Sequence, residues 1–217
     1  MSVKQRVTEL RKKLQMEGLD AMLISNSENR RYLSGFTGSS GYLVVTQEES
    51  ILLTDFRYTE QASNQSPDFT IERIGGNYAW LSNIVQELEI KKMGFEGQDL
   101  SFATHLIFKD ILNESTKGDG PSSFIPTDGI VESIRILKDG RELELLTHAI
   151  RLSDKAINKI APYIETGVKE SDIAWSLEKE MRDGGAESVA FDIIVGSGAN
   201  GALPHHRAGE KLIQDGD

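Results

Sequence analysis

The sequence predicts an α/β protein in two parts. Apolar segments of strand type and helix type alternate over roughly the first 120 residues, which is typical of a sheet covered by helices. Beyond Ile134 the apolar residues recur at helical spacing over two long stretches instead. The expected fold is therefore an N-terminal α/β domain, followed by a second unit that begins with helices.

The elements of the first part are expected in a regular order. An amphipathic helix begins at Val3 and stops at Gly18, and a loop of small residues over 29–41 follows the first strand. A polar turn joins two strands into a hairpin. The expected strands cover 19–24, 42–46, 50–54, 69–74 and 93–95, and the expected helices cover 55–63, 78–88 and 100–112.

A change in composition marks the second part. Residues 115–123 hold Gly118, Gly120 and Pro121 among small polar residues, which is typical of a linker. We place the domains at 1–130 and 131–217, with the division inside 130–139. The second domain is expected to contain helices over 141–164 and 173–181, then a short, largely buried strand over 191–195.

Composition and charge exclude several classes of protein. The net charge of -10 argues against nucleic acid as a partner, because a phosphate backbone requires a basic surface. The chain has no cysteine, which excludes disulfides, thiolate metal sites and a cysteine nucleophile. There is no apolar signal core at the N-terminus and no apolar run near the ~20 residues that a membrane span needs. We therefore expect a cytoplasmic protein with no membrane partner.

A glycine loop follows the last expected strand. Gly196, Gly198 and Gly201 match the pattern G-x-G-x-x-G, which in dinucleotide-binding proteins leads into a helix. Pro204 arrives three residues after the last glycine, where such a helix would be under way. A dinucleotide site is therefore disfavoured.

Two adjacent histidines end this loop. On an extended backbone His205 and His206 point to opposite sides, so they are poor joint ligands for one ion. Either could be an ordinary loop histidine, but a loop placed by a rigid strand is where functional residues concentrate. A neutral imidazole can donate to an oxyanion or pass a proton. Glu170 and Asp172 are interpreted as first-turn acids that favour the helix dipole.

Several segments together resemble the proline-specific metallopeptidase family that contains prolidase, aminopeptidase P and creatinase. The resemblance covers nearly the whole chain, and the segments occur in the family's order. They are N-R-R-Y-L-S-G-F-T-G-S-S-G at 29–41, D-F-R-Y-T-E-Q-A at 55–62, G-F-E-G at 94–97, R-I-L-K-D at 135–139 and F-D-I-I-V-G-S-G-A-N-G-A-L-P-H at 191–205.

The resemblance implies a fold and an activity. It implies a creatinase/prolidase-type N-terminal α/β domain with a mixed sheet, followed by an incomplete α+β "pita-bread" domain. Members cleave the bond before a proline at or near a peptide N-terminus, so proline-containing peptides are the expected substrates, and a homodimer is the expected assembly. They use two divalent metals, commonly manganese or cobalt.

The resemblance also assigns site residues. His205 matches the histidine that contacts the substrate carbonyl and the tetrahedral intermediate, whereas His206 occupies a variable position. The family's metal ligands lie after the Gly-Asp pair matched by Gly216 and Asp217. We therefore expect no metal ligand and no bound metal within residues 1–217, and no activity from this chain alone. Two alternatives stay open: a creatinase-like amidinohydrolase, or a metal-free binding module on the same fold.

Overall fold

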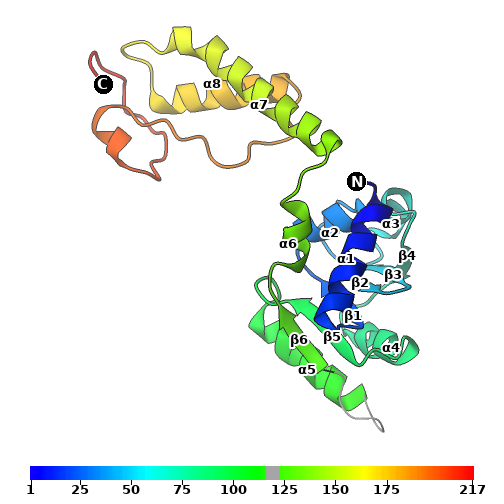
Figure 1. The fold of residues 1–217 in the computed structure, drawn as a ribbon. Coiled ribbons are helices and arrows are strands. Elements are labelled where there is room, and N and C mark those ends of the chain that lie inside the picture. The colour runs from blue at the N-terminus through cyan, green and yellow to red at the C-terminus, as the bar shows by residue number, and fades with distance from the viewer. Residues whose placement is uncertain (116–122) are drawn as a thin grey trace. The chain divides into compact units, whose positions relative to one another are not determined.

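The computed structural model describes residues 1–115 and 123–217, and these form two compact units. The first unit is Met1–Leu137 and the second is Lys138–Asp217. Most of the linker expected over 115–123 lies outside the described residues. Figure 1 shows the helices and strands of each unit.

The first unit alternates helices and strands along the chain, as the apolar pattern predicts. The expected hairpin is confirmed with both strands at the predicted residues. The helices are α1 (Val3–Glu17), α2 (Ser27–Ser34), α3 (Thr59–Gln65), α4 (Ala79–Glu87), α5 (Phe102–Ser115) and α6 (Ile130–Arg135). The strands are β1 (Ala21–Ile24), β2 (Tyr42–Thr46), β3 (Ser50–Thr54), β4 (Thr70–Arg73), β5 (Lys92–Glu96) and β6 (Ser123–Thr127).

The six strands form one mixed sheet in the order β4-β3-β2-β1-β5-β6. β2 pairs antiparallel with both β1 and β3, and the other three pairings are parallel. The registers place Leu23 opposite Val44 on one side and Phe95 on the other. The predicted α/β class with a mixed sheet is confirmed.

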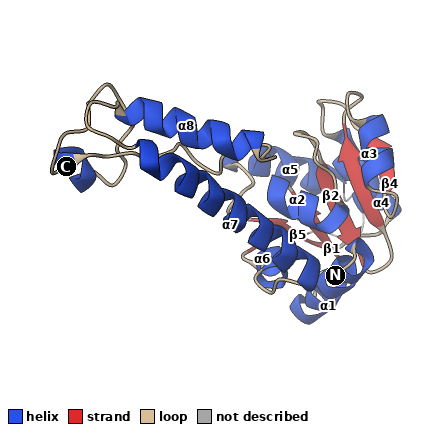
Figure 2. Ribbon diagram, turned by 90° about the horizontal axis from the view of Figure 1, so that it is seen from above, coloured by secondary structure: helices blue, strands red, loops and turns tan. Residues whose placement is uncertain are grey.

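Helices cover both faces of this sheet, as Figure 2 shows from above. Alternate residues of β1 point to opposite faces, so Met22 and Ile24 join one core and Ala21 and Leu23 join the other. α1, α2, α3 and α6 pack on the first face, and α4 and α5 pack on the second. Burial on both faces explains why the central strands are nearly continuous apolar runs.

The helix α2 was not predicted. The small residues over 29–41 predict a loop, but residues 27–34 are helical. The side chain of Asn26 accepts a 3.0 Å hydrogen bond from the Asn29 amide, and Gly35 ends the helix in the left-handed conformation. The helix spans eight residues and many of them are polar, so its apolar period is too short to stand out.

The structure places residues 131–137 in the first unit. Val131 and Ile134 of α6 are buried in the core with α1, so this unit extends past 130/131 and ends within the range 130–139 given for the division. Neither α6 nor the edge strand β6 was predicted. Both are too short to show a periodic apolar pattern, and their apolar residues can be assigned to the core only from their packing in the folded unit.

The second unit begins with two long helices. α7 (Gly140–Ile160) starts with a capping box, in which Asp139 and Glu142 bond reciprocally to each other's backbone amides. A short 3₁₀ turn, η1 (Ala161–Tyr163), precedes α8 (Glu170–Asp183), and a second, η2 (Gly198–Ala202), follows it. A small core of Ile160, Ile173 and Leu177 lies between the two long helices.

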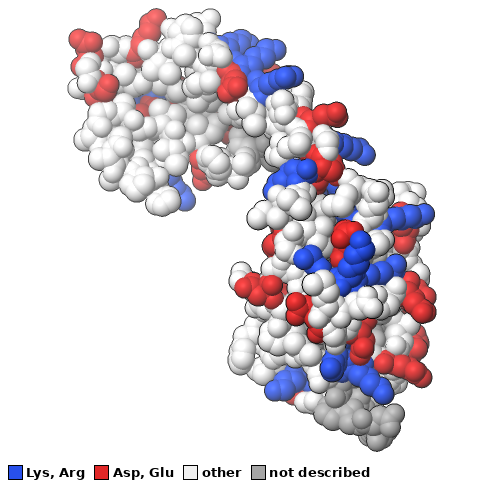
Figure 3. Space-filling view, viewed as in Figure 1, with Lys and Arg blue, Asp and Glu red and all other residues white. Residues whose placement is uncertain are grey.

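Much apolar surface of the second unit is exposed. In the face that Figure 3 shows, residues other than Lys, Arg, Asp and Glu cover most of this unit, whereas both signs of charge are spread over the first unit. The exposed large apolar residues of α7 and α8 are Leu143, Leu145, Leu146, Ile150, Ile157 and Trp175.

The strand predicted over 191–195 does not form. Ile193 and Val195 do pack on the α7–α8 core while Ile194 is exposed, so the alternation of side chains is present. A strand also requires a hydrogen-bonded neighbour. No described strand pairs with these residues, and their backbone is irregular.

Among the described helices, none is long and apolar enough to cross a membrane.

Candidate active-site loop

The chain that follows the glycine loop, residues 209–213, is held against the start of α8 by backbone hydrogen bonds. The amides of Glu170 and Ser171 donate to the carbonyls of Lys211 and Gly209, at 3.0 and 3.1 Å. Further along, Gly167 donates to Ile213 and Ile213 donates to Val168. The amides of the first turn of a helix have no acceptor within the helix. In α8, those of Glu170 and Ser171 donate to carbonyls of the chain that follows the loop.

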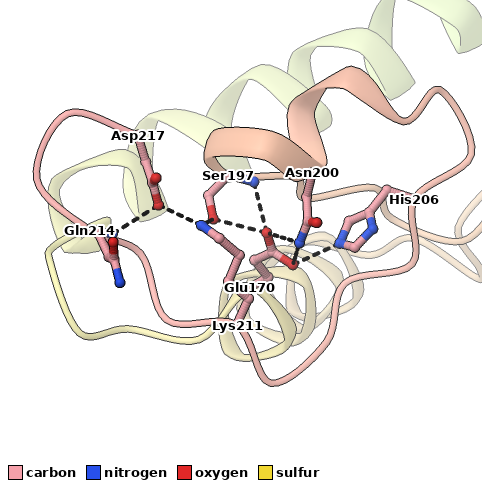
Figure 4. A network of polar contacts seen from close by, with 7 residues as sticks. All are labelled: Glu170, Ser197, Asn200, His206, Lys211, Gln214 and Asp217. Carbon is pink, nitrogen blue, oxygen red and sulfur yellow. Dashed lines mark hydrogen bonds and ion pairs between the residues drawn. The ribbon is translucent and has the colours of Figure 1, made fainter.

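Glu170 lies at the centre of a network that this pairing brings together (Figure 4). Its Oε1 accepts hydrogen bonds from the amide and the hydroxyl of Ser197, at 2.7 and 2.9 Å. The side-chain amide of Asn200 donates to both carboxylate oxygens, at 3.1 and 3.2 Å. Nε2 of His206 lies 2.7 Å from Oε2. One carboxylate therefore contacts both ends of the segment 197–206.

The hydrogen bonds around Glu170 favour the ionised form of its carboxyl group. Its side chain has no exposed surface. The Ser197 amide, followed by His206 and Asn200, holds the pKa of this carboxyl well below its ordinary value against the opposing effect of burial. Because an ionised carboxylate only accepts hydrogen bonds, Nε2 of His206 is the donor in their contact.

A second branch of the network reaches the last residue of the chain. Nζ of Lys211 donates to Oγ of Ser197 at 2.7 Å and to the carboxylate of Asp217 at 2.6 Å. Asp217 also accepts a 2.9 Å hydrogen bond from the amide of Gln214. In Figure 4 the Lys211 ammonium lies between Ser197 and Asp217, so it links the glycine loop to the end of the chain.

The two histidines have different surroundings. His205 is exposed, and its side chain forms no hydrogen bond with the part of the chain that the structure describes. The side chain of His206 is 15% exposed and contacts Glu170. The backbone here is a turn, in which the His206 amide donates to the Leu203 carbonyl at 3.2 Å, and not the extended chain on which the two rings were expected to point to opposite sides. The catalytic role expected for His205 stays a prediction.

The glycine pattern does not form a dinucleotide site. Neither the required strand before it nor an α-helix after it is present, because 198–202 is a 3₁₀ turn. Glycine is needed at two positions for local reasons. A Cβ at Gly196 would lie 2.9 Å from the Asn200 carbonyl oxygen, and Gly198 has a positive φ of 50°.

A separate cavity of about 250 Å³ lies in the first unit, at the carboxyl ends of β1, β5 and β6. Its lining includes Glu96, whose Oε2 accepts hydrogen bonds from the amides of Ser25 and Asn26 at 2.7 and 2.6 Å. Asn29 donates to the other oxygen of Glu96 and also to Glu132. Burial raises the pKa of Glu96 above its ordinary value, although these hydrogen bonds oppose the shift. We interpret these contacts as structural, since they join the loop after β1 to β5 and α6.

The described residues do not fit a catalytic metal pair. Within 1–115 and 123–217, no three His, Cys, Asp or Glu side chains are placed so that they could hold an ion. These side chains can therefore contribute hydrogen bonds and a histidine ring to a site, but they do not form a metal centre by themselves.

Comparison with known proteins places these features in a family. Residues 6–137 match the model of the creatinase/prolidase N-terminal domain, and residues 144–217 match that of metallopeptidase family M24. The chain belongs to the creatinase/prolidase family. The resemblance seen in the sequence is thereby confirmed.

Several relatives of this creatinase/prolidase chain are similar over its whole length. It is 35% identical to an uncharacterized peptidase, YqhT, of Bacillus subtilis, covering 98% of this chain and 58% of the relative. The solved structure of an Xaa-Pro dipeptidase from Bacillus anthracis is 36% identical with a TM-score of 0.90, over 98% of this chain and 58% of that one. The chain thus spans somewhat over half the length of these relatives.

One further structure corresponds to the first unit. The N-terminal domain of the cytoplasmic peptidase PepQ from Mycobacterium tuberculosis is 34% identical with a TM-score of 0.54. It covers 60% of this chain, and 98% of that domain is matched.

Glu170, the central residue of the network, is not predicted by the sequence to be a site residue. Glu170 was interpreted as an acid that favours the helix dipole, but its side chain bonds to residues 27–36 positions later in the chain. One signal was available in the sequence. Glu170 lies at helical spacing from Ile173 and Leu177, so it is on the apolar face of α8, where an acid is expected to be buried. Its partners were not visible in any local pattern.

Proposed function

We propose that the complete protein is a metallopeptidase that cleaves the bond before proline at or near the N-terminus of a peptide. The observation that carries this proposal is the likeness to the Bacillus anthracis Xaa-Pro dipeptidase, which extends through both units and through the glycine loop. The match to metallopeptidase family M24 over 144–217 supports it independently.

In this proposal His205 is the residue of the described chain that contacts the substrate. It is exposed at the end of an anchored loop, and its side chain is not engaged by other described residues. A ring N–H at this position would donate to the carbonyl oxygen as negative charge develops on it. His206 does not take this role, because its Nε2 is directed to Glu170.

The metals of the complete enzyme would be held by residues other than those that the structure describes. By the family resemblance they are two divalent ions, manganese or cobalt, bound after the Gly216-Asp217 pair. When bound, such ions polarise the peptide carbonyl and activate water at neutral pH.

We also propose that the complete protein is a cytoplasmic homodimer. Gel filtration with light scattering on the complete protein tests its assembly.

The activity is tested with the complete protein and added manganese or cobalt. The substrates are an Xaa-Pro dipeptide, a tripeptide with proline second, matched peptides with alanine in place of proline, and creatine. We expect hydrolysis of the proline peptides only, and loss of activity after chelation. Creatine hydrolysis would indicate an amidinohydrolase, and a stable protein without metal or turnover would indicate a binding module. Either result overturns the proposal.

A further inference from the structure

We propose that Glu170 is a positioning residue, which fixes the loop 197–206 and thereby the place of His205. This inference rests on the proposed role of His205 in substrate binding. Glu170 itself is buried and does not need to touch the substrate. It acts through the segment that ends at the histidine pair.

The hydrogen bonds of Glu170 reach the whole length of the loop. Its carboxylate accepts from Ser197 at the beginning of the loop, from Asn200 in the 3₁₀ turn and from His206 at the end. One carboxylate therefore holds the beginning, the middle and the end of the loop together. Because His206 directly follows His205, an anchor on one ring restricts the backbone that carries the other.

Glu170 is itself held in place by its position in α8. Glu170 is the first residue of α8, and its own amide donates to the Lys211 carbonyl at 3.0 Å. The helix that carries it packs on α7 through Ile173 and Leu177. The loop is thus attached to the helical core of the unit and not to another loop.

Other acids on the same helix make different contacts. Glu178 pairs with Arg182 one turn later, and Glu180 pairs with Lys159 of α7. Both pairs join helical residues and are partly exposed, so each is expected to contribute little. The carboxylate of Glu170 is instead directed to the loop.

The test uses the complete protein with Glu170→Gln, and Glu178→Gln as the matched control on the same helix. Hydrogen exchange of residues 197–206 is measured together with kcat, KM and metal content. We expect faster exchange in this loop and a kcat lower by about 10- to 100-fold, with metal content unchanged, because misplacing a reacting group by about 1 Å has effects of this size. The control should match the wild type in all four measurements.

A double-mutant cycle separates positioning from a general loss of stability. If Glu170 acts through His205, Glu170→Gln should lower kcat in the wild-type background and have little effect in a His205→Ala background. An equal effect in both backgrounds overturns the inference. So does unchanged exchange over 197–206.

A second pair of variants covers the case in which Glu170→Gln does not fold. His206→Gln keeps an N–H donor for the carboxylate, and His206→Leu removes it. We expect the loop exchange and kcat of His206→Gln to lie close to the wild type and those of His206→Leu to change. If the complete wild-type protein hydrolyses no proline peptide, the proposed function fails, and the exchange measurements still decide whether Glu170 orders the loop.

Discussion

The ring of His206 donates a 2.7 Å hydrogen bond from Nε2 to the buried carboxylate of Glu170, which lies 36 positions earlier in the chain. The neighbouring ring of His205 is exposed. Two adjacent residues of identical chemistry thus have different surroundings, one facing the protein and one facing solvent. We infer a division between anchoring and substrate contact from this arrangement.

The order of the loop should depend on pH through Glu170. The hydrogen bonds lower the folded-state pKa of this carboxyl below its ordinary value of 4.5. Since the unfolded state binds the proton more readily, the stabilisation is present above the ordinary pKa and is lost as the pH falls toward the lower folded value. We expect the exchange protection of residues 197–206 to decrease over that range. Equal pH dependence in Glu170→Gln would contradict this origin.

Replacing His205 should affect turnover without affecting folding. In the complete protein we expect His205→Ala to lower kcat by about 10²–10³, the effect of removing one donor to an oxyanion. Metal content should stay the same, because His205 is not expected to be a ligand. His206→Gln is the control for the adjacent position. Loss of metal in His205→Ala, or an equal loss of activity in the control, would refute this assignment.

Replacing Glu96 should destabilise the first unit. Glu96→Ala leaves the amides of Ser25 and Asn26 without their acceptor, and a buried donor left unsatisfied costs about 1–3 kcal/mol. We expect the free energy of unfolding in urea to fall by that order. Asp128→Ala is the control, because Asp128 is exposed and accepts from the Gln98 side chain. A change in the control as large as in Glu96→Ala would argue against the hydrogen-bond explanation.

The first unit should fold alone, and its C-terminal limit should include α6. We expect a fragment of residues 1–137 to unfold cooperatively in urea. A fragment of residues 1–130 lacks Val131 and Ile134, which are buried in the core with α1. Each such side chain contributes about 1.5–3 kcal/mol when fully buried, so the shorter fragment should have a clearly lower midpoint. Equal midpoints would support the boundary at 130/131 instead.

Much of the first unit was predictable from the sequence, because its signals are local. The short, continuous apolar runs of β2 and β3 and the apolar stripe of α1 are each visible within one element. The family segments also lie within single elements and the loops beside them. These patterns determined the α/β class, the hairpin and the resemblance to the creatinase/prolidase family.

Tertiary structure decided the features that depend on distant partners. Residues 191–195 have the side-chain alternation of a strand, but a strand also needs a paired neighbour, which their own sequence does not specify. Short elements such as α2 and α6 become recognisable only in the folded protein, where Leu33 and Ile134 are buried in the core. The role of Glu170 was hidden for the same physical reason. A carboxylate becomes an anchor only when folding brings Ser197, Asn200 and His206 within hydrogen-bond distance of it.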